Sequence, residues 1–328
     1  MLEVSGLTVE YATGKAPVLA VDDVSFSVED GEFLGIVGES GCGKSTLLFA
    51  IAQLLSPPAQ ITAGSVTFSG KNLVGMTDKQ LSALRWQKLS VVMQSAMNAL
   101  NPVKSVAAQF ADALRAHGMT SRKAIAGRSA EVLRLVGVDP VHLKSFPHQL
   151  SGGMRQRAMI AMALLFTPEL VIMDEPTSAL DVVAQRSLMV QIKELQRELG
   201  FAIVFVTHDM SLVSHFSDRL MVMYAGQVAE LGGTRQIFDN PLHPYSKGLL
   251  EAFPGIRGPK VPLKGIPGAP PDLSIVQNGC RFLPRCPQRL DECATTAPEL
   301  VPRDGSTVRC LLYAGACTNA QPSTGAKK

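Results

Sequence analysis

Long hydrophobic runs are missing from this sequence. The longest is AMIAMALLF, at residues 158–166, and it is far shorter than the roughly 20 residues that a membrane-spanning helix needs. The first residues, MLEVSGLTVEY, contain neither a basic segment nor an apolar segment after it, so no secretory signal is predicted. A formal net charge of +3 is too mild to indicate a nucleic-acid partner. We therefore expect a chain that does not cross a membrane by itself and does not bind nucleic acid.

The composition is that of a globular protein. Of 328 residues, 46% are hydrophobic and 18% are charged, which excludes a chain disordered throughout. A chain of this length can bury a full hydrophobic core, and it fits one large domain with a smaller additional region. Residues 254–303 contain ten of the 21 prolines, so a region with a different type of structure is predicted to begin near Phe253. We predict one domain at residues 1–255 and an extension rich in cysteine and proline at residues 256–328.

Hydrophobic patterning favours an α/β fold. Segments such as LEVSGLTVEY, ELVIMDEP and AIVFVTHD are rich in β-branched and apolar residues and are predicted strands, whereas residues 105–145 have the spacing of amphipathic helices. Strands that alternate with helices are typical of a largely parallel sheet. We predict a β-rich N-terminal part and a helical subdomain, at about residues 95–166, inserted between strands.

The segment GESGCGKS matches the phosphate-binding pattern GxxxxGK[ST]. It follows a predicted strand and opens a predicted helix, which is the context that a P-loop requires. Its glycines let successive N–H groups turn toward phosphate, and the helix N-terminus adds positive potential. Lys44 is expected to reach the β- and γ-phosphates, and the Ser45 hydroxyl to bind Mg²⁺. The predicted ATP-binding residues of this segment are Gly38, Glu39, Ser40, Gly41, Cys42, Gly43, Lys44, Ser45 and Thr46.

Two carboxylates end one of the predicted buried strands. Asp174 is placed to hold Mg²⁺, and Glu175, on the other face of the chain, could polarise an attacking water. His208 ends another apolar strand, IVFVTHD. Nucleotides bind at the carboxyl edge of such sheets, so a hydrogen bond from His208 to the γ-phosphate is its expected role.

The segment LSGGMRQR, at residues 150–157, indicates a second anion site. A serine and paired glycines at a helix N-terminus expose backbone N–H groups to an anion. The chain already has a P-loop for its own nucleotide. If LSGGMRQR lies on the helical insertion, it can face the nucleotide of a second molecule.

Taken in order, these motifs resemble the ATP-binding subunits of ABC transporters over residues 1–255. The family signature LSGGQ stands here as LSGGM, and Met154 occupies a position that varies in the family. The resemblance implies that Tyr11 stacks on adenine. It also implies that Gln94 is the Q-loop glutamine, which serves Mg²⁺ and catalysis, and that the D-loop ends at Asp181.

The same resemblance assigns roles at the γ-phosphate and between subunits. Glu175 and His208 match the catalytic base and the switch histidine. Two subunits are implied to pair head to tail and to enclose two ATP. Each ATP would contact the P-loop of one chain and the signature of the other, whose contacting residues are Ser151, Gly152 and Gly153.

Four further segments look like the oligopeptide, dipeptide and nickel branch of import ATPases. They are VVMQSAMNALNPVKSV, NPLHPYSKGLLEAFP, GIPGAPPDL and GCRFLPRCP. This resemblance implies an ATPase that powers uptake of di- or oligopeptides, or a related solute such as nickel. The implied partners are a second ABC ATPase subunit in a homo- or heterodimer, two transmembrane permease subunits and an extracytoplasmic solute-binding protein. The implied location is peripheral, at the cytoplasmic face of the cell membrane.

Cys280, Cys286, Cys293 and Cys310 fall in a stretch of 31 residues. Without a secretory signal, metal ligation is favoured over disulfides. Their gaps are wider than the CxxC-like pairs of structural zinc, whereas an iron–sulfur cluster needs four cysteine thiolates. Some members of the resembled branch carry a [4Fe–4S] cluster on this pattern, which makes the cluster the leading prediction; zinc, reduced thiols and disulfides stay open. Cys317 fits no pattern.

Two other functions stay open at this point. A soluble ABC ATPase of translation or DNA repair usually holds two ABC units or long coiled coils, and this chain has one unit and no heptads. The other alternative is a redox-responsive ATPase regulated by the C-terminal cluster. The expected cofactors are ATP, Mg²⁺ and the [4Fe–4S] cluster.

Overall fold

The structure is a computed structural model that describes residues 1–14, 16–94, 99–178, 180–252, 265–275 and 277–314. Cys317 lies outside the described residues. The strands are β1 (Leu2–Tyr11), β2 (Val18–Val28), β3 (Phe33–Val37), β4 (Ala59–Phe68), β5 (Lys71–Asn72), β6 (Leu89–Val92), β7 (Leu170–Asp174), β8 (Ala202–Val206), β9 (Arg219–Tyr224), β10 (Gln227–Gly233), β11 (Leu300–Arg303) and β12 (Ser306–Arg309). The α-helices are α1 (Lys44–Ile51), α2 (Asp78–Leu84), α3 (Val106–Ala116), α4 (Arg122–Leu135), α5 (Gly152–Ala163), α6 (Val182–Leu199), α7 (Met210–Phe216), α8 (Thr234–Asp239) and α9 (Pro244–Glu251).

An eight-stranded sheet forms the centre of the molecule, in the order β11-β12-β10-β9-β3-β8-β7-β6. Neighbouring strands from β9 to β6 run parallel, and β10, β12 and β11 continue the sheet with antiparallel pairing. Every residue of β3, β7 and β8 is buried, as expected for parallel strands covered on both faces. The predicted α/β fold is therefore confirmed. The parallel strands also bring their carboxyl ends to one edge of the sheet.

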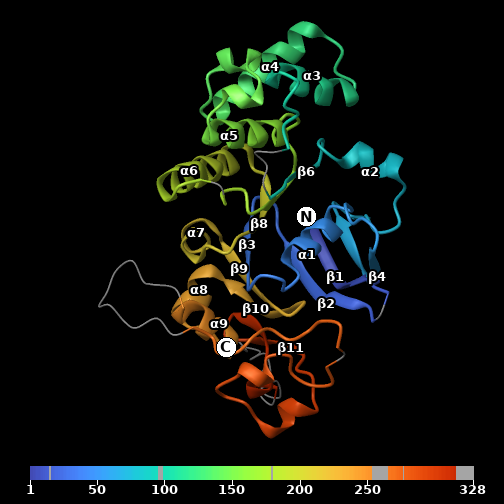
Figure 1. The fold of residues 1–328 in the computed structure, drawn as a ribbon, viewed down its shortest axis with the longest axis vertical. Helices are drawn as coiled ribbons and strands as arrows, with labels where there is room; N and C mark the ends of the chain where they lie inside the picture. Colours follow the sequence, from blue (N-terminus) through green and yellow to red (C-terminus); the bar gives the residue numbers. More distant parts are fainter. Residues whose placement is uncertain (15, 95–98, 179, 253–264, 276, 315–328) are drawn as a thin grey trace, which may run out of the picture.

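A second, antiparallel sheet of order β2-β1-β4-β5 makes up the β-rich N-terminal part. The burial of β1 alternates along much of its length, which is typical of a sheet with one face on a core. Helix α1 contacts β1 and β2 of this sheet and β7 of the large sheet. The helix that follows the P-loop is therefore held between the two sheets (Figure 1).

Three helices, α3, α4 and α5, lie between β6 and β7 in the chain and form one end of the molecule (Figure 1). A serine caps each N-terminus: Ser105, Ser121 and Ser151 each accept a hydrogen bond from a backbone N–H of the first turn. Gly118 and Gly137 follow the ends of α3 and α4 with φ of 90° and 71°, a conformation that glycine adopts without strain. The sequence therefore encodes both ends of these helices locally.

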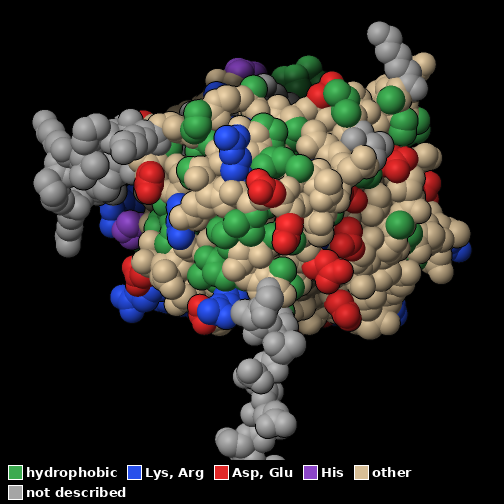
Figure 2. Space-filling view, turned by 90° about the horizontal axis from the view of Figure 1, so that it is seen from below, with side chains coloured by type: hydrophobic (Ala, Val, Ile, Leu, Met, Phe, Trp, Pro, Cys, Tyr) green, Lys and Arg blue, Asp and Glu red, His purple; other side chains and the backbone are tan. Residues whose placement is uncertain are grey.

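The extension lies at the opposite end of the molecule (Figure 1). Its described residues form short 3₁₀ turns and one hairpin, β11–β12. β12 pairs with β10 of the large sheet, with Glu230 opposite Val308, so the extension continues the central sheet. Seen from this end, acidic and basic side chains are both present, with hydrophobic side chains between them (Figure 2).

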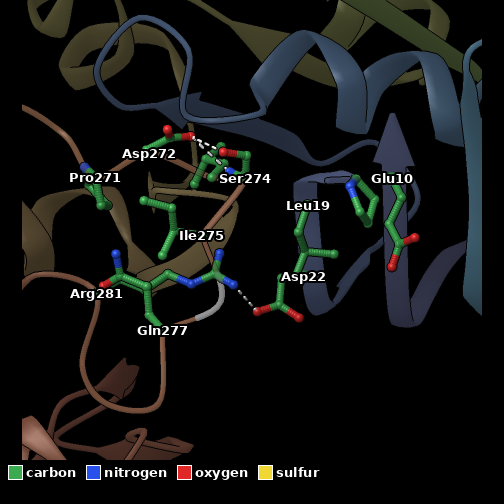
Figure 3. A pocket seen from close by; sticks show the side chains of 11 residues that line it. Glu10, Leu19, Asp22, Pro271, Asp272, Ser274, Ile275, Gln277 and Arg281 are labelled. Atoms are coloured by element: carbon green, nitrogen blue, oxygen red, sulfur yellow. Dashed lines mark hydrogen bonds and ion pairs between the residues drawn. The ribbon is translucent and has the colours of Figure 1, made fainter. Parts of the chain in front are cut away.

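The extension also contacts the N-terminal sheet. The Leu19 N–H on β2 donates to the Leu273 carbonyl at 3.2 Å, and Arg281 pairs with Asp22 at 2.6 Å. These contacts border a pocket of about 240 Å³, into which Glu10 also faces (Figure 3). The extension is therefore attached to both sheets.

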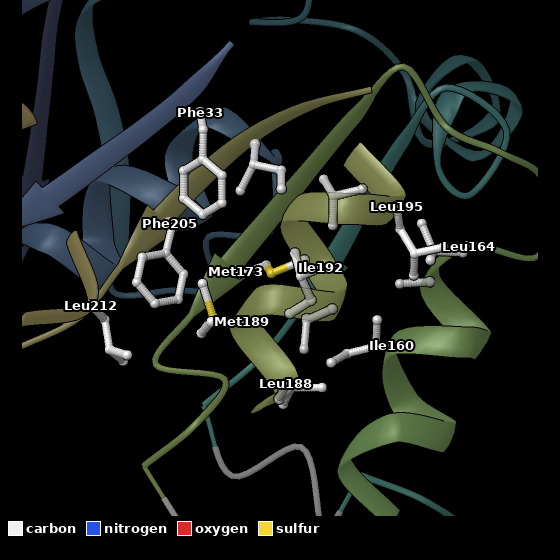
Figure 4. Packing of buried hydrophobic residues seen from close by; sticks show 14 of the residues in the cluster. Phe33, Ile160, Leu164, Met173, Leu188, Met189, Ile192, Leu195, Phe205 and Leu212 are labelled. Carbon is white, nitrogen blue, oxygen red and sulfur yellow. The ribbon is translucent and has the colours of Figure 1, made fainter. Parts of the chain in front are cut away.

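The hydrophobic core fills both faces of the large sheet. On one face, Met189 and Ile192 of α6 pack over Phe33 and Phe205, whose ring centroids are 5.8 Å apart in an edge-to-face arrangement (Figure 4). This packing fixes α6, and with it the Asp181 N-cap that begins the helix. None of the helices in the described part of the chain is long and apolar enough to span a membrane.

Candidate active site

The segment GESGCGKS forms a loop between β3 and α1, in a backbone conformation that requires glycine. Gly38 and Gly43 have φ of 154° and 99°. A Cβ atom at Gly38 would meet the Met223 carbonyl oxygen at 2.2 Å, and one at Gly43 would meet the Ala20 carbonyl oxygen at 2.1 Å. The loop thus packs against β2 and β9 at distances that no side chain permits.

Lys44 points back into this loop. Its side chain donates hydrogen bonds to the carbonyl oxygens of Gly38 at 2.8 Å and Glu39 at 2.9 Å. Lys44 is buried, so its charge acts in a region of low dielectric. Burial raises the pKa of the neighbouring Cys42 thiol, and the Lys44 ammonium opposes that shift. The loop therefore concentrates one positive charge where a phosphate can approach.

The first turn of α1 adds to this positive potential. Gly43 is its N-cap and supplies no side-chain hydrogen bond, and the turn contains no acidic residue. Backbone N–H groups of a first turn without a cap can bind an anion. At the end of β1, the Tyr11 hydroxyl lies 3.1 Å from Thr46 Oγ1. An aromatic ring therefore stands beside the loop and its helix.

Asp174, the last residue of β7, is a buried carboxylate beside the loop. Burial raises its pKa, a hydrogen bond with Ser45 and the Lys44 charge lower it, and the Glu175 charge raises it. Among the described residues, Asp174 Oδ1 has no hydrogen-bond partner. A buried carboxylate oxygen without a partner, next to a hydroxyl, fits a hard cation such as Mg²⁺, which prefers oxygen ligands.

Glu175 lies directly beyond β7 and is the centre of a second cluster. Its Oε2 accepts a hydrogen bond from Gln94 Nε2 at 2.9 Å, and its Oε1 lies 3.2 Å from His208 Nδ1. The Glu175 N–H donates to the Val206 carbonyl, and its φ of 43° turns the side chain out of the strand. Gln94, Glu175 and His208 each follow a strand in the contiguous order β6-β7-β8. The sheet order therefore brings together three side chains that can hold and deprotonate a water molecule.

The signature and the D-loop lie at the N-termini of two other helices. Ser151 caps α5 and is exposed, and a Cβ atom at Gly153 would meet nothing within 4 Å. Asp181 caps α6 by accepting the Ala184 N–H at 2.9 Å. The signature is on the helical end of the molecule and is open to an approaching molecule.

Known proteins are similar to this chain in sequence and in fold. A family model described as ABC transporter matches residues 21–178. The dipeptide transport ATP-binding protein DppD of Bacillus subtilis is 42% identical over 331 residues, which cover 100% of this chain and 99% of the relative. The chain belongs to the ABC transporter ATP-binding proteins. The oligopeptide transport ATP-binding protein OppD of Salmonella typhimurium is 42% identical over 91% of this chain and 89% of its own length.

Solved structures and a second family model support the assignment of this ABC ATPase to its family. One match is the dimeric structure of MJ0796, a bacterial ABC transporter cassette, with a TM-score of 0.65 and 30% sequence identity. The alignment covers 72% of this chain and 99% of the cassette chain. A dimeric post-hydrolysis state of the same cassette, bound to ADP and Pi, matches equally well. The model of the oligopeptide/dipeptide transporter C-terminal region matches residues 229–293. The match includes both HPYSKGLL and GCRFLPRCP.

The four cysteines of this ABC ATPase do not form a metal site in the structure. Cys280, Cys286, Cys293 and Cys310 are free thiols. Burial raises the pKa of Cys280 and Cys286, and raises that of Cys310 to about 11. Within the described ranges, no group of three or more His, Cys, Asp or Glu side chains could hold a metal ion. The predicted [4Fe–4S] cluster is therefore not supported.

Two contacts of the P-loop were not predicted from the sequence of this ABC ATPase. Arg285 of the extension pairs with Glu39, and the Tyr245 hydroxyl accepts the Glu39 N–H. The signals were the segments GCRFLPRCP and HPYSKGLL, which stood out as branch features without an assigned role. A distance in sequence of 246 residues separates Glu39 from Arg285, so no local pattern could pair them.

Proposed function

We propose that this chain is the ATP-hydrolysing subunit of an importer of di- or oligopeptides. The observation that carries the proposal is the Glu175 carboxylate, which lies between the Gln94 amide and the His208 ring. Glu175 directly follows β7, the strand that presents Asp174 to the P-loop. The relatives named for dipeptide and oligopeptide transport support an importer over a soluble ABC ATPase or a redox-responsive one.

ATP binding rests on the P-loop and its surroundings. Lys44 would exchange hydrogen bonds with the Gly38 and Glu39 carbonyls for bonds to the β- and γ-phosphates. The open N–H groups at the start of α1 would bind phosphate oxygens. The Tyr11 ring would stack on the base, held by its hydroxyl contact with Thr46.

Mg²⁺ would be held by Ser45, Asp174 and Gln94. The unpaired Asp174 Oδ1 beside Ser45 fits that ion. When bound, Mg²⁺ offsets the charge of the β- and γ-phosphates. Burial raises the pKa of Asp174, and Ser45 and Lys44 oppose that shift.

Hydrolysis is assigned to Glu175. Its carboxylate would orient a water molecule and accept its proton while the water oxygen bonds to the γ-phosphorus and the bond to the bridging oxygen breaks. Gln94 and His208 would fix the direction of the carboxylate, since each hydrogen-bonds to a different oxygen of Glu175. His208 would also contact the γ-phosphate.

A second subunit would complete each site. Ser151, Gly152 and Gly153 lie at the exposed N-terminus of α5, where they can contact the ATP of a partner in a head-to-tail dimer, and Asp181 would lie at the same contact. Two transmembrane permease subunits and an extracytoplasmic solute-binding protein would be the other partners, with this chain peripheral at the cytoplasmic face. Co-purification from membranes, followed by mass spectrometry, tests these partners.

The decisive test of the ATPase is Glu175→Gln. ATP hydrolysis should fall by about 100-fold or more, the usual contribution of a general base, while the Kd for ATP stays unchanged because the P-loop is intact. Glu169→Gln is the matched control, since Glu169 lies just before the other end of β7 and pairs with Lys88. Hydrolysis by Glu175→Gln at the rate of the control would remove Glu175 from this role.

The C-terminal thiols have no role in this mechanism. The arrangement of Cys280, Cys286, Cys293 and Cys310 does not fit a cluster, so no step is assigned to one. Iron and zinc analysis of protein purified without oxygen tests the sequence-based prediction directly. An absorbance band of an iron–sulfur centre that disappears in Cys286→Ser would restore it.

A further inference from the structure

Glu39, the second residue of the P-loop, is held at three points. Its carbonyl accepts a hydrogen bond from Lys44 Nζ at 2.9 Å. Its N–H donates to the Tyr245 hydroxyl at 2.9 Å. Its carboxylate accepts two hydrogen bonds from the Arg285 guanidinium, at 2.7 and 2.8 Å. The residue that holds the phosphate-binding lysine is therefore itself held by α9 and by the extension.

Arg285 is built into its position. Its side chain is 4% exposed, and its Nε donates to the Pro267 carbonyl at 2.8 Å. The guanidinium also lies 5.8 Å from the centre of the Tyr224 ring. The hydrogen bonds to Glu39 are the main reason why the pKa of Arg285 is raised, and the guanidinium is therefore always charged. A two-pronged pair of this kind is among the stronger hydrogen-bonded contacts in proteins.

Tyr245 is equally constrained. It is fully buried, and its ring lies 4.6 Å from that of Tyr224 and 5.5 Å from that of Phe282 of the extension, measured between centroids. Burial raises the pKa of its hydroxyl far above the usual value, so the group stays protonated. The aromatic cluster therefore ties HPYSKGLL and GCRFLPRCP to each other and to the P-loop.

We propose that Arg285 is a positioning residue for ATP binding, which acts through Glu39. Without it, the Glu39 carboxylate would be an unpaired negative charge beside the phosphate site. That charge would attract Lys44 away from the phosphates and repel ATP. Arg285 neutralises Glu39 and fixes the P-loop backbone from which Lys44 turns toward the phosphates, so the extension completes the nucleotide site. This inference rests on the proposed ATP-binding function.

The test is a double-mutant cycle read by ATP affinity. We expect Arg285→Gln to raise the Kd and the KM for ATP by about tenfold, which corresponds to about 1.4 kcal/mol, with kcat changed by less than about twofold because the effect is on binding. Glu39→Gln removes the charge that Arg285 neutralises. The double variant Glu39→Gln/Arg285→Gln should therefore bind ATP more tightly than Arg285→Gln alone.

Arg309→Gln is the matched control. Arg309 is also a largely buried arginine of the extension that precedes a cysteine, and it bonds to the Val228 and Pro298 carbonyls, away from the P-loop. The Arg309→Gln variant should have a lower melting temperature and an unchanged Kd for ATP. If Arg285→Gln does not fold, Arg285→Lys replaces it in the test. Lysine keeps the positive charge but cannot donate the two parallel hydrogen bonds that the guanidinium gives to Glu39. A weaker ATP affinity than that of the wild type is then expected.

Three results would overturn the inference. One is an Arg285 variant that melts at a lower temperature yet binds ATP as the wild type does, which would make the pair purely structural. Another is equal loss of affinity in the Arg285 and Arg309 variants, and the third is a double variant that binds no better than Arg285→Gln. Failure of the wild type to bind ATP would instead refute the proposed function itself, and the inference with it.

Discussion

The buried His243 should make the stability of this ABC ATPase sensitive to mild acid. His243 is the N-cap of α9, and its Nδ1 accepts the Tyr245 N–H at 2.9 Å. Burial lowers its pKa to about 4, compared with about 6.5 for an exposed histidine. Protonation of Nδ1 would remove the acceptor for the Tyr245 N–H and would place a charge inside the aromatic cluster.

The size of the effect follows from the two pKa values. Because the folded-state pKa is the lower one, the unfolded chain binds more protons between about pH 4 and 6.5, and stability falls as the pH falls through that window. A difference of about 2.5 between the pKa values corresponds to about 3 kcal/mol when the whole window is crossed. Above pH 6.5 both states are neutral at His243, and this contribution is fully present.

The assay compares the wild type with His243→Asn. Asparagine can still cap α9 by accepting the Tyr245 N–H, but it does not titrate. Free energies of unfolding from urea titrations at pH 7, 6, 5 and 4.5 should fall more steeply in the wild type than in the variant. Parallel pH profiles for the two proteins would refute the reasoning, because His243 would then contribute nothing to the slope.

Two further perturbations test the site. Ser151→Arg should leave ATP binding by the single chain unchanged, because the signature serves the partner's nucleotide, but should block ATP-driven dimerisation in sedimentation experiments; loss of ATP binding by the monomer would contradict the two-chain site. Gly43→Ala should abolish ATP binding and destabilise the fold by more than about 2 kcal/mol, since its Cβ would overlap the Ala20 carbonyl oxygen. Gly127→Ala in α4, whose Cβ meets nothing within 4 Å, is the control, and calorimetry showing equal losses in both would disprove the steric argument.

The sequence predicted those parts of the site whose chemistry lies in consecutive residues. The P-loop from Gly38 to Ser45 needs only local glycines, a lysine and a helix start, and each is written in adjacent positions. Ser151 was likewise predicted at a helix N-terminus, where it caps α5. The α/β fold could be predicted for the same reason, because strand and helix periodicities are local.

Sheet order and packing decided which distant residues meet. The sequence places Gln94, Glu175 and His208 after separate strands, and the family resemblance assigns their roles, but their mutual contacts depend on the order β6-β7-β8. No local pattern predicts that β12 pairs with β10 or that Arg285 bonds to Glu39. Such contacts form because a buried arginine needs hydrogen-bond acceptors and a strand is stabilised by a neighbour that takes up its unpaired backbone groups, and only the folded chain determines which groups are within reach.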